Sequence, residues 1–256
     1  MIDLQSHRLQ HPLTINQVGI KKIKHPIKIA ISNDNIQNSI AIINMSVELI
    51  DKQRGTHMSR FVEILNQRYW VLSLPVLKEL LNLTAQHLET ETVYIQLEST
   101  IFLEKFAPVS KKANFVNYDV CFSGSKRINN YILQVTVSVP VTSLCPCSKA
   151  ISDFSAHSQR ACIQVTVESK HDINIQQLIR VVEKEASSEV YSILKRADEK
   201  YVTEQAYEKP KFVEDIVRDI AQKIEYMKYI GYYRIYSESY ESIHNHSAFA
   251  VIERQI

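Results

Sequence analysis

The chain has 256 residues, of which 45% are hydrophobic and 23% are charged, and its formal net charge at pH 7 is +2. This balance lacks the strong positive field of nucleic-acid-binding proteins, so we expect no nucleic-acid partner. No apolar run reaches the length of a membrane span, and charges interrupt the first thirty residues, so we expect a cytoplasmic protein with no membrane partner. Only four glycines occur, which argues against glycine-rich phosphate loops.

The first half of the chain predicts two strands, two helices and two more strands. β-branched residues dominate the first two segments, and Asn33-Asp34-Asn35 between them has turn chemistry. Apolar residues then recur with helical spacing, and alternation typical of strands follows. The predicted elements cover residues 19–31, 36–50, 58–67, 74–88, 92–106 and 114–123.

The second half predicts the same order. Its long helix has a possible break near Ser187-Ser188, and its last helix begins with Pro210, whose missing amide costs nothing there. The predicted elements cover residues 127–141, 160–169, 175–194, 210–228, 232–240 and 247–253.

The repeated order predicts an α+β fold in which helices cover one face of antiparallel sheets. We expect an extended arm over residues 1–15, a first unit over 16–125 and a second unit over 126–256. Residues 105–113, which contain Pro108, are expected to form a linker. One continuous α+β domain is the alternative.

A cluster of soft metal ligands follows the first strand of the second half. Cys145 and Cys147 lie in Ser-Leu-Cys-Pro-Cys-Ser-Lys, and His157 lies in Ser-Ala-His-Ser-Gln-Arg. A cysteine before a helical turn lies near free backbone amides, which lower the pKa of the thiol. The spacing does not fit a closed structural zinc site. An open metal or nucleophilic site and a pair of inert cysteines both remain open interpretations.

Two carboxylates could join this cluster. Glu199 lies in a strongly charged stretch that ordinarily forms a solvated helix end, but its carboxylate would complete a three-ligand set with a thiolate and an imidazole. Glu214 lies in the first turns of the last helix, where acidic residues usually complement the helix dipole.

Three polar residues fall in the predicted final hairpin, where histidines two residues apart share one face of a regular strand. Solvated turn residues are the alternative interpretation. A triphosphate would need several cations in place of a glycine loop, although ordinary surface charge explains each one individually. The hairpin residues are Glu241, His244 and His246, and the cations that we assign to substrate binding are Lys149, Arg160 and Lys200.

Taken together, these motifs closely resemble the type IB GTP cyclohydrolases. The resemblance includes Leu-Lys-Arg-Ala-Asp-Glu-Lys-Tyr-Val-Thr-Glu around Glu199, Pro-Lys-Phe-Val-Glu-Asp around Glu214, and Gly-Thr-His-Met-Ser-Arg from Gly55. It extends from about residue 15 onward. It implies the tunnelling fold, in which two strand-strand-helix-helix-strand-strand units are fused in each subunit, and a homo-oligomer, usually a homotetramer, with sites at subunit interfaces.

The resemblance also implies roles for the candidate residues. Cys145, His157 and Glu199 would hold a divalent zinc, manganese or iron ion, and no organic cofactor is expected. Glu214 would bind the guanine edge. The catalytic positions near the reacting ring would be Glu241, His244, His246 and, in a supporting role, Cys147.

The implied reaction opens the imidazole ring of GTP by water attack at C8, releases formate and gives 7,8-dihydroneopterin triphosphate. The product would enter folate synthesis, queuosine-type tRNA modification or both. The alternatives are a nitrile reductase-like enzyme of the same fold, which needs a cysteine nucleophile and a nicotinamide cofactor, and a non-catalytic zinc-binding assembly module.

Overall fold

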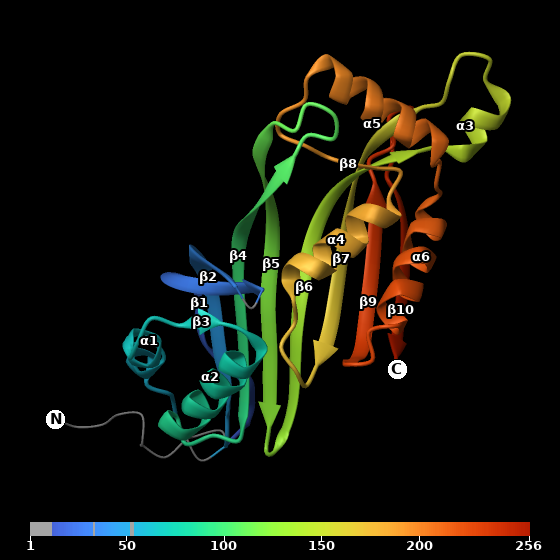
Figure 1. Ribbon diagram of the computed structural model, residues 1–256. Coiled ribbons are helices and arrows are strands. Elements are labelled where there is room, and N and C mark those ends of the chain that lie inside the picture. Colours follow the sequence, from blue (N-terminus) through green and yellow to red (C-terminus); the bar gives the residue numbers. More distant parts are fainter. Residues whose placement is uncertain (1–11, 33, 52–53) are drawn as a thin grey trace. The chain divides into compact units, whose positions relative to one another are not determined.

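The computed structural model describes residues 12–32, 34–51 and 54–256. Within these residues the chain has a mixed α+β fold with a large, mainly antiparallel sheet and six helices (Figure 1). It divides into two compact units. The first contains the chain up to Ser99 together with residues 121–135 and 170–173, and the second contains residues 100–120, 136–169 and 174–256.

In the first unit the strand order is β3-β1-β2-β4-β5-β6. The two long strands β1 and β2 pair antiparallel, whereas β3 pairs with β1 in parallel. Two helices, α1 and α2, belong to this unit, and β4, β5 and β6 each contribute only one end to it. The bounds are β1 Ile15–Ser32, β2 Asn35–Leu49, α1 Met58–Asn66, β3 Val71–Leu72, α2 Leu74–His87, β4 Thr92–Phe106, β5 Ala113–Arg127 and β6 Asn130–Leu144.

The apolar residues of this unit alternate along the strands and recur along the helices. Ile27, Ile29 and Ile31 of β1 are buried, and the residues between them are more exposed. Helix α2 packs against the sheet so closely that a Cβ atom on Gly124 would lie 3.0 Å from the side chains of Leu77 and Leu81. Close packing of leucines on glycine therefore holds α2 on the sheet.

Strand β1 also approaches β2 unusually closely at Gly19. A Cβ atom there would lie 2.0 Å from the carbonyl oxygen of Met45. The β1–β2 register shifts on both sides of this point, between Ile15 and Val18 and again between Ile20 and Ile23. The absence of a side chain at Gly19 thus permits the irregular path of β1.

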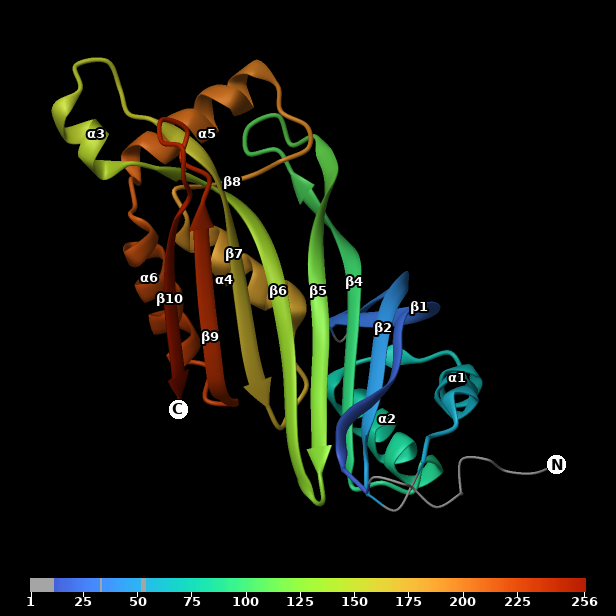
Figure 2. The same ribbon diagram turned by 180° about the vertical axis from the view of Figure 1, so that it is seen from behind.

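The second unit has the strand order β4-β5-β6-β7-β9-β10, with β8 paired to β6. Helices α4 and α6 lie on one face of these strands, and no helix formed by the described residues lies on the opposite face (Figures 1 and 2). The bounds are α3 Pro146–Ile151, β7 Ser158–Ser169, α4 Ile175–Glu185, β8 Ser188–Glu189, α5 Arg196–Glu208, α6 Val213–Glu225, β9 Ile230–Ser239 and β10 Ala248–Gln255.

Burial explains why these helices lie where they do. Ile163 and Val165 of β7 and Ile235 of β9 point to the covered face and are fully buried. Residues of the opposite face, such as Gln164 and Arg234, remain accessible. The helices place one apolar stripe against the strands, with Ile179 of α4 among the buried residues.

The predicted helix over residues 175–194 is wrong in its C-terminal part. Helix α4 ends at Glu185, and a short strand follows instead. The hydroxyl of Ser187 accepts a hydrogen bond from the backbone of Leu144 at 3.2 Å, and Ser188 pairs with Thr142 of β6. Side-chain bonding to the backbone and strand pairing therefore replace the helix at the serine pair.

Two other expectations about this region are also wrong. Residues 105–113 are not a linker, because β4 continues to Phe106 and a tight turn with the bond Ala107 N to Lys112 O connects it to β5. Pro210 does not begin the last helix, which starts at Val213. The backbone amide of Lys211 instead donates to Leu144 O at 3.1 Å.

The first half follows the predicted order with β3 inserted between its helices, whereas the second half adds α3, β8 and α5. Residues 1–11 of the predicted arm and Asn33 of the predicted turn lie outside the described residues, and Ile15 begins β1. Over the part of the chain that the structure describes, each helix is too short or too polar to cross a membrane.

The close approach at Gly19 generates a stability prediction. Gly19→Ala should lower the free energy of unfolding by about 1–3 kcal/mol, because the new methyl group must displace backbone atoms of β2. Gly231→Ala is the matched control, since a Cβ atom there meets no atom within 4 Å, and its effect should stay within about 0.5 kcal/mol. Urea unfolding at a fixed protein concentration measures both; equal effects would contradict the packing argument.

Candidate active site

The site is built around the end of β6 and the start of β7. Cys145 is the N-cap residue of α3, with Pro146 as the first helical residue. The backbone amide of Cys145 donates to His157 O at 3.1 Å. The hydroxyl of Ser148 donates to Cys145 O and accepts from His157 N, each at 3.2 Å. We call these three bonds the Cys145–His157 clamp; they hold the two predicted ligands side by side.

The surroundings of Cys145 favour the thiolate form of its side chain. Burial raises its pKa, but hydrogen bonds from Ser148 and Cys147 and the nearby His157 ring outweigh burial and lower the pKa below its usual value. One of these bonds joins Ser148 N to Cys145 Sγ at 3.5 Å. A half-buried thiolate of this kind can ligate a metal or act as a nucleophile.

The His157 ring is oriented by one neighbour on β7 and one in the loop that follows β9. Its Nδ1 atom lies 2.9 Å from Gln159 Oε1 and 3.8 Å from Glu241 Oε2. Gln159 donates its amide group to Ser239 Oγ at 3.2 Å and Glu241 Oε1 at 3.4 Å, so its carbonyl oxygen faces the imidazole. Because this oxygen only accepts hydrogen bonds, it selects the neutral tautomer in which Nδ1 carries the proton and Nε2 offers its lone pair.

The two remaining predicted histidines lie beside His157. They belong to the loop between β9 and β10, within the hairpin where we expected them, and are exposed as in the alternative interpretation of solvated turn residues. The rings of His244 and His246 are stacked with centroids 5.1 Å apart, and the His244 ring meets the His157 ring edge-on at 6.4 Å. Three imidazoles and the Glu241 carboxylate therefore gather at one place, which suits proton transfer.

Glu214 lies in the first turn of α6, and the segment before this helix is bonded to the end of β6. Lys211, three residues before it, donates to Leu144 O next to Cys145. Asp215, not Glu214, caps α6 by accepting from Phe212 N at 3.1 Å. The exposed Glu214 carboxylate has no partner among the described residues and is therefore free to bind a ligand.

Glu199 lies in the first turn of α5, away from Cys145 and His157. Its neighbour Asp198 is buried and accepts hydrogen bonds from Val109 N, Ser110 N and the Ser110 hydroxyl, which fixes the start of α5 to the β4–β5 turn. Helix α5 contacts α3 at its other end, at Tyr207, about 12 Å further along the helix axis. Across the described residues, no group of three or more His, Cys, Asp or Glu side chains could hold a metal ion.

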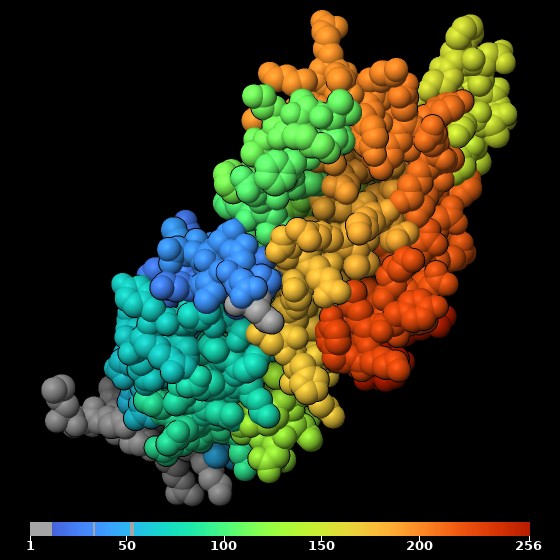
Figure 3. All heavy atoms as spheres, in the orientation of Figure 1, coloured from blue at the N-terminus to red at the C-terminus, as the bar shows by residue number. Residues whose placement is uncertain are grey.

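The other assigned residues differ in their contacts. Lys149 donates to Tyr207 O and lies 4.1 Å from the centre of the Tyr207 ring. Arg160 lines a cavity of about 590 Å³ between β6, β7 and α5. Lys200 forms an exposed ion pair with Glu204. Cys147 is exposed on α3, which projects from the surface of the second unit (Figure 3).

The sequence interpretation missed the residues that orient the ligands. Gln159 was a detectable candidate, because it lies two positions after His157 and strand alternation places both on one side. Ser148 belongs to the cysteine motif itself. Ser239 carried no signal, because only the pairing of β7 with β9 brings it to the site.

Solved structures with a similar fold are uricases. The uricase of Arthrobacter globiformis aligns with a TM-score of 0.53 over 93% of this chain and 93% of its own, with 8% sequence identity. The uricase of Bacillus fastidious aligns with a TM-score of 0.57 over 94% of each chain, with 6% identity. At such identities the likeness extends to the fold alone.

Sequence relatives agree on one family. A family model described as type I GTP cyclohydrolase FolE2 matches residues 1–250. The GTP cyclohydrolases FolE2 of Nitrosococcus oceani and Thiobacillus denitrificans are each 46% identical over 253 residues, which is 99% of this chain and 95% and 94% of theirs. The chain therefore belongs to the FolE2 family of type I GTP cyclohydrolases.

Proposed function

We propose that this chain is a GTP cyclohydrolase I that opens the guanine imidazole ring at the Cys145–His157 clamp. Water adds at C8 of GTP, formate leaves, and ring closure gives 7,8-dihydroneopterin triphosphate. The clamp carries this proposal, because it joins a thiol of lowered pKa to an imidazole with a free Nε2 beside two more histidines. Family membership favours this reaction over a nitrile reductase or a zinc-binding module.

The donor set of the clamp fits a divalent cation. Cys145 supplies sulfur, and His157 supplies Nε2 with its Nδ1 proton held by Gln159. When bound, zinc, manganese or iron supplies Lewis acidity that makes water a nucleophile near neutral pH. A site with a third protein ligand would leave a position open for that water.

We propose that Glu199 of a second copy completes the ligand set. Within one chain Glu199 is held at the far end of α5 by Asp198, whereas Cys145 and His157 meet at α3. A homo-oligomer with sites at subunit interfaces, as in the homotetramer that we expect, would bring the two ends together. The tunnelling fold with two fused units is the arrangement that we propose for such a subunit.

Glu214, for which the described part of the chain supplies no partner, would accept hydrogen bonds from the guanine N–H groups. His244 and His246 would move protons during ring opening and closure, and Glu241 would hold His157 in place. Lys149, Arg160 and Lys200 would bind the triphosphate, and Cys147 would support the site from α3. A cytoplasmic location and a product used in folate or queuosine synthesis remain predictions.

The first test concerns the clamp. Cys145→Ala should lose bound metal and release almost no formate from GTP, because it removes the sulfur donor. Metal content by elemental analysis and formate release measure these two effects separately. Cys121→Ala, which changes a thiol of the first unit, is the control and should keep both. Full metal content in Cys145→Ala would reject its assignment as a ligand.

The second test concerns the orientation of His157. Gln159→Leu should lower metal affinity or turnover by about 10–100-fold, because it removes the acceptor that fixes the imidazole tautomer. Gln159→Glu should restore part of the loss, since a carboxylate also accepts the hydrogen bond from Nδ1–H, although it cannot donate to Ser239 and Glu241 as the amide does. Metal titration and kcat report the effect. Equal losses in both variants would show that the residue acts only through packing.

The third test concerns the second copy. Cys145→Ala and Glu199→Ala should each be inactive alone, but a mixture of the two refolded together should regain part of the activity. Recovery is expected because some sites then combine an intact Cys145 from one chain with an intact Glu199 from another. GTP turnover after mixing measures it. A mixture as inactive as its components would place all three ligands in one chain.

A further inference from the structure

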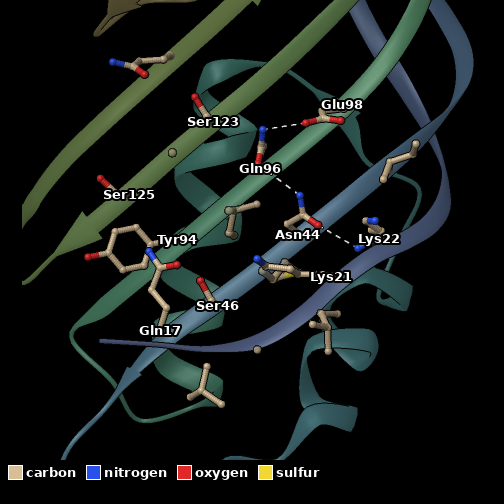
Figure 4. Close-up of a pocket in the computed structure, with 18 of the residues that line it drawn as sticks. Gln17, Lys21, Lys22, Asn44, Ser46, Tyr94, Gln96, Glu98, Ser123 and Ser125 are labelled. Carbon is tan, nitrogen blue, oxygen red and sulfur yellow. Dashed lines mark hydrogen bonds between the residues drawn. The ribbon is translucent and has the colours of Figure 1, made fainter. Parts of the chain in front are cut away.

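The first unit carries a large polar cavity that the proposed reaction does not use. It lies on strands β1, β2, β4, β5 and β6, and its volume is about 1430 Å³ (Figure 4). All of its lining residues belong to the first unit.

Most of the charged residues that line this cavity are positive. Lys21, Lys22 and Lys24 line it, and over the described ranges none of their ammonium groups has a carboxylate within ion-pair distance. Glu98 is the one carboxylate among the lining residues, and its Oε1 accepts a hydrogen bond from Gln96 at 2.8 Å. Unpaired ammonium groups around a concave surface favour an anionic ligand.

The backbone of β1 forms a strained bulge at Lys21 and Lys22. Lys22 has a φ of 59°, which is unusual for a side-chain-bearing residue, and it lies within the register shift between Ile20 and Ile23. Asn44 Oδ1 accepts from Lys22 N at 2.9 Å, and Asn44 Nδ2 donates to Gln96 Oε1 at 3.3 Å. This side-chain ladder holds the bulge in place, and such supported strain gathers at binding sites.

The other wall offers hydrogen-bonding groups that have no protein partner. Figure 4 shows Tyr94, Ser123 and Ser125 across the strands from Lys22. The hydroxyl groups of these three residues and the carboxamide of Gln134 make no hydrogen bond within the described part of the chain. A ligand with several oxygen atoms would satisfy them, and a hydroxyl group on that ligand could donate to the free oxygen of Glu98.

We propose that this cavity binds a phosphorylated polyhydroxy molecule, with its phosphate on the three lysines and its hydroxyl groups on the opposite wall and Glu98. Lysine suits phosphate as a point charge without the fixed geometry of arginine. The proposal does not depend on the reaction proposed above, because no residue of the Cys145–His157 clamp lines the cavity.

The test is calorimetric titration of the full-length protein with ribose 5-phosphate. Lys21→Gln/Lys24→Gln should weaken binding about tenfold or more, because it removes two of the three charges. Lys28→Gln/Lys170→Gln removes the same charge from exposed positions of the same unit outside the cavity, and it should leave binding unchanged. Binding should also weaken with added salt.

Two further sets of titrations show which part of the ligand and which unit of the protein produce the binding heat. Ribose and inorganic phosphate should each bind more weakly than ribose 5-phosphate, since each engages one wall only. Arg160→Ala should not change the affinity; a loss there would move the binding to the second unit and overturn the proposal. Equal affinity in both lysine pairs, or no heat with ribose 5-phosphate, would also overturn it. GTP turnover by Lys21→Gln/Lys24→Gln, measured in parallel, reports separately on the catalytic proposal.

Discussion

The backbone hydrogen bond from Cys145 to His157 is the contact on which the arrangement of the site depends. It joins the residue immediately before α3 to the residue immediately before β7. The Ser148 hydroxyl closes the same gap from the other side by bonding to both residues. Since one bond of the clamp joins two main-chain atoms and the other two use the short hydroxyl of Ser148, the clamp does not rely on long, flexible side chains. Hydrogen bonds from Ser148 and Cys147 to the thiol, together with the nearby His157 ring, lower the pKa of Cys145.

Each unit has one apolar sheet face that helices cover and one polar face that they leave open. In the second unit, α4 and α6 cover the valines and isoleucines of β6, β7 and β9. In the first unit, α2 lies on the sheet at Gly124. Alternation along a strand puts every second residue on the open face, which is why polar residues accumulate there and form the cavity of the first unit.

The start of α5 shows how a buried charge can set the position of a functional residue. Burial raises the pKa of Asp198, but hydrogen bonds from Ser110, Lys195 and Val109 outweigh it and hold the pKa well below its usual value. The ionised carboxylate thereby binds the helix start to the β4–β5 turn. Glu199, the next residue, is consequently fixed away from the clamp of its own chain, which is the physical basis for proposing a shared site.

The sequence by itself determined the periodic elements and the chemistry of the motifs. Strand β4 has its predicted bounds, and α1, α2 and β9 lie within two residues of theirs, because long apolar periodicities leave little freedom. Cys145 and His157 could be named as candidates because a thiol before a proline-initiated turn, followed by an imidazole before a strand, forms a pattern that local sequence already displays. Tertiary structure decided what depends on distant partners. Ser188 forms strand β8 with Glu189 because both pair with β6. The last helix starts after Lys211, whose backbone amide bonds to Leu144 instead. Ser239 lies at the site because β9 pairs with β7. Local sequence cannot encode such contacts, because their free energy arises only when segments far apart in the chain meet.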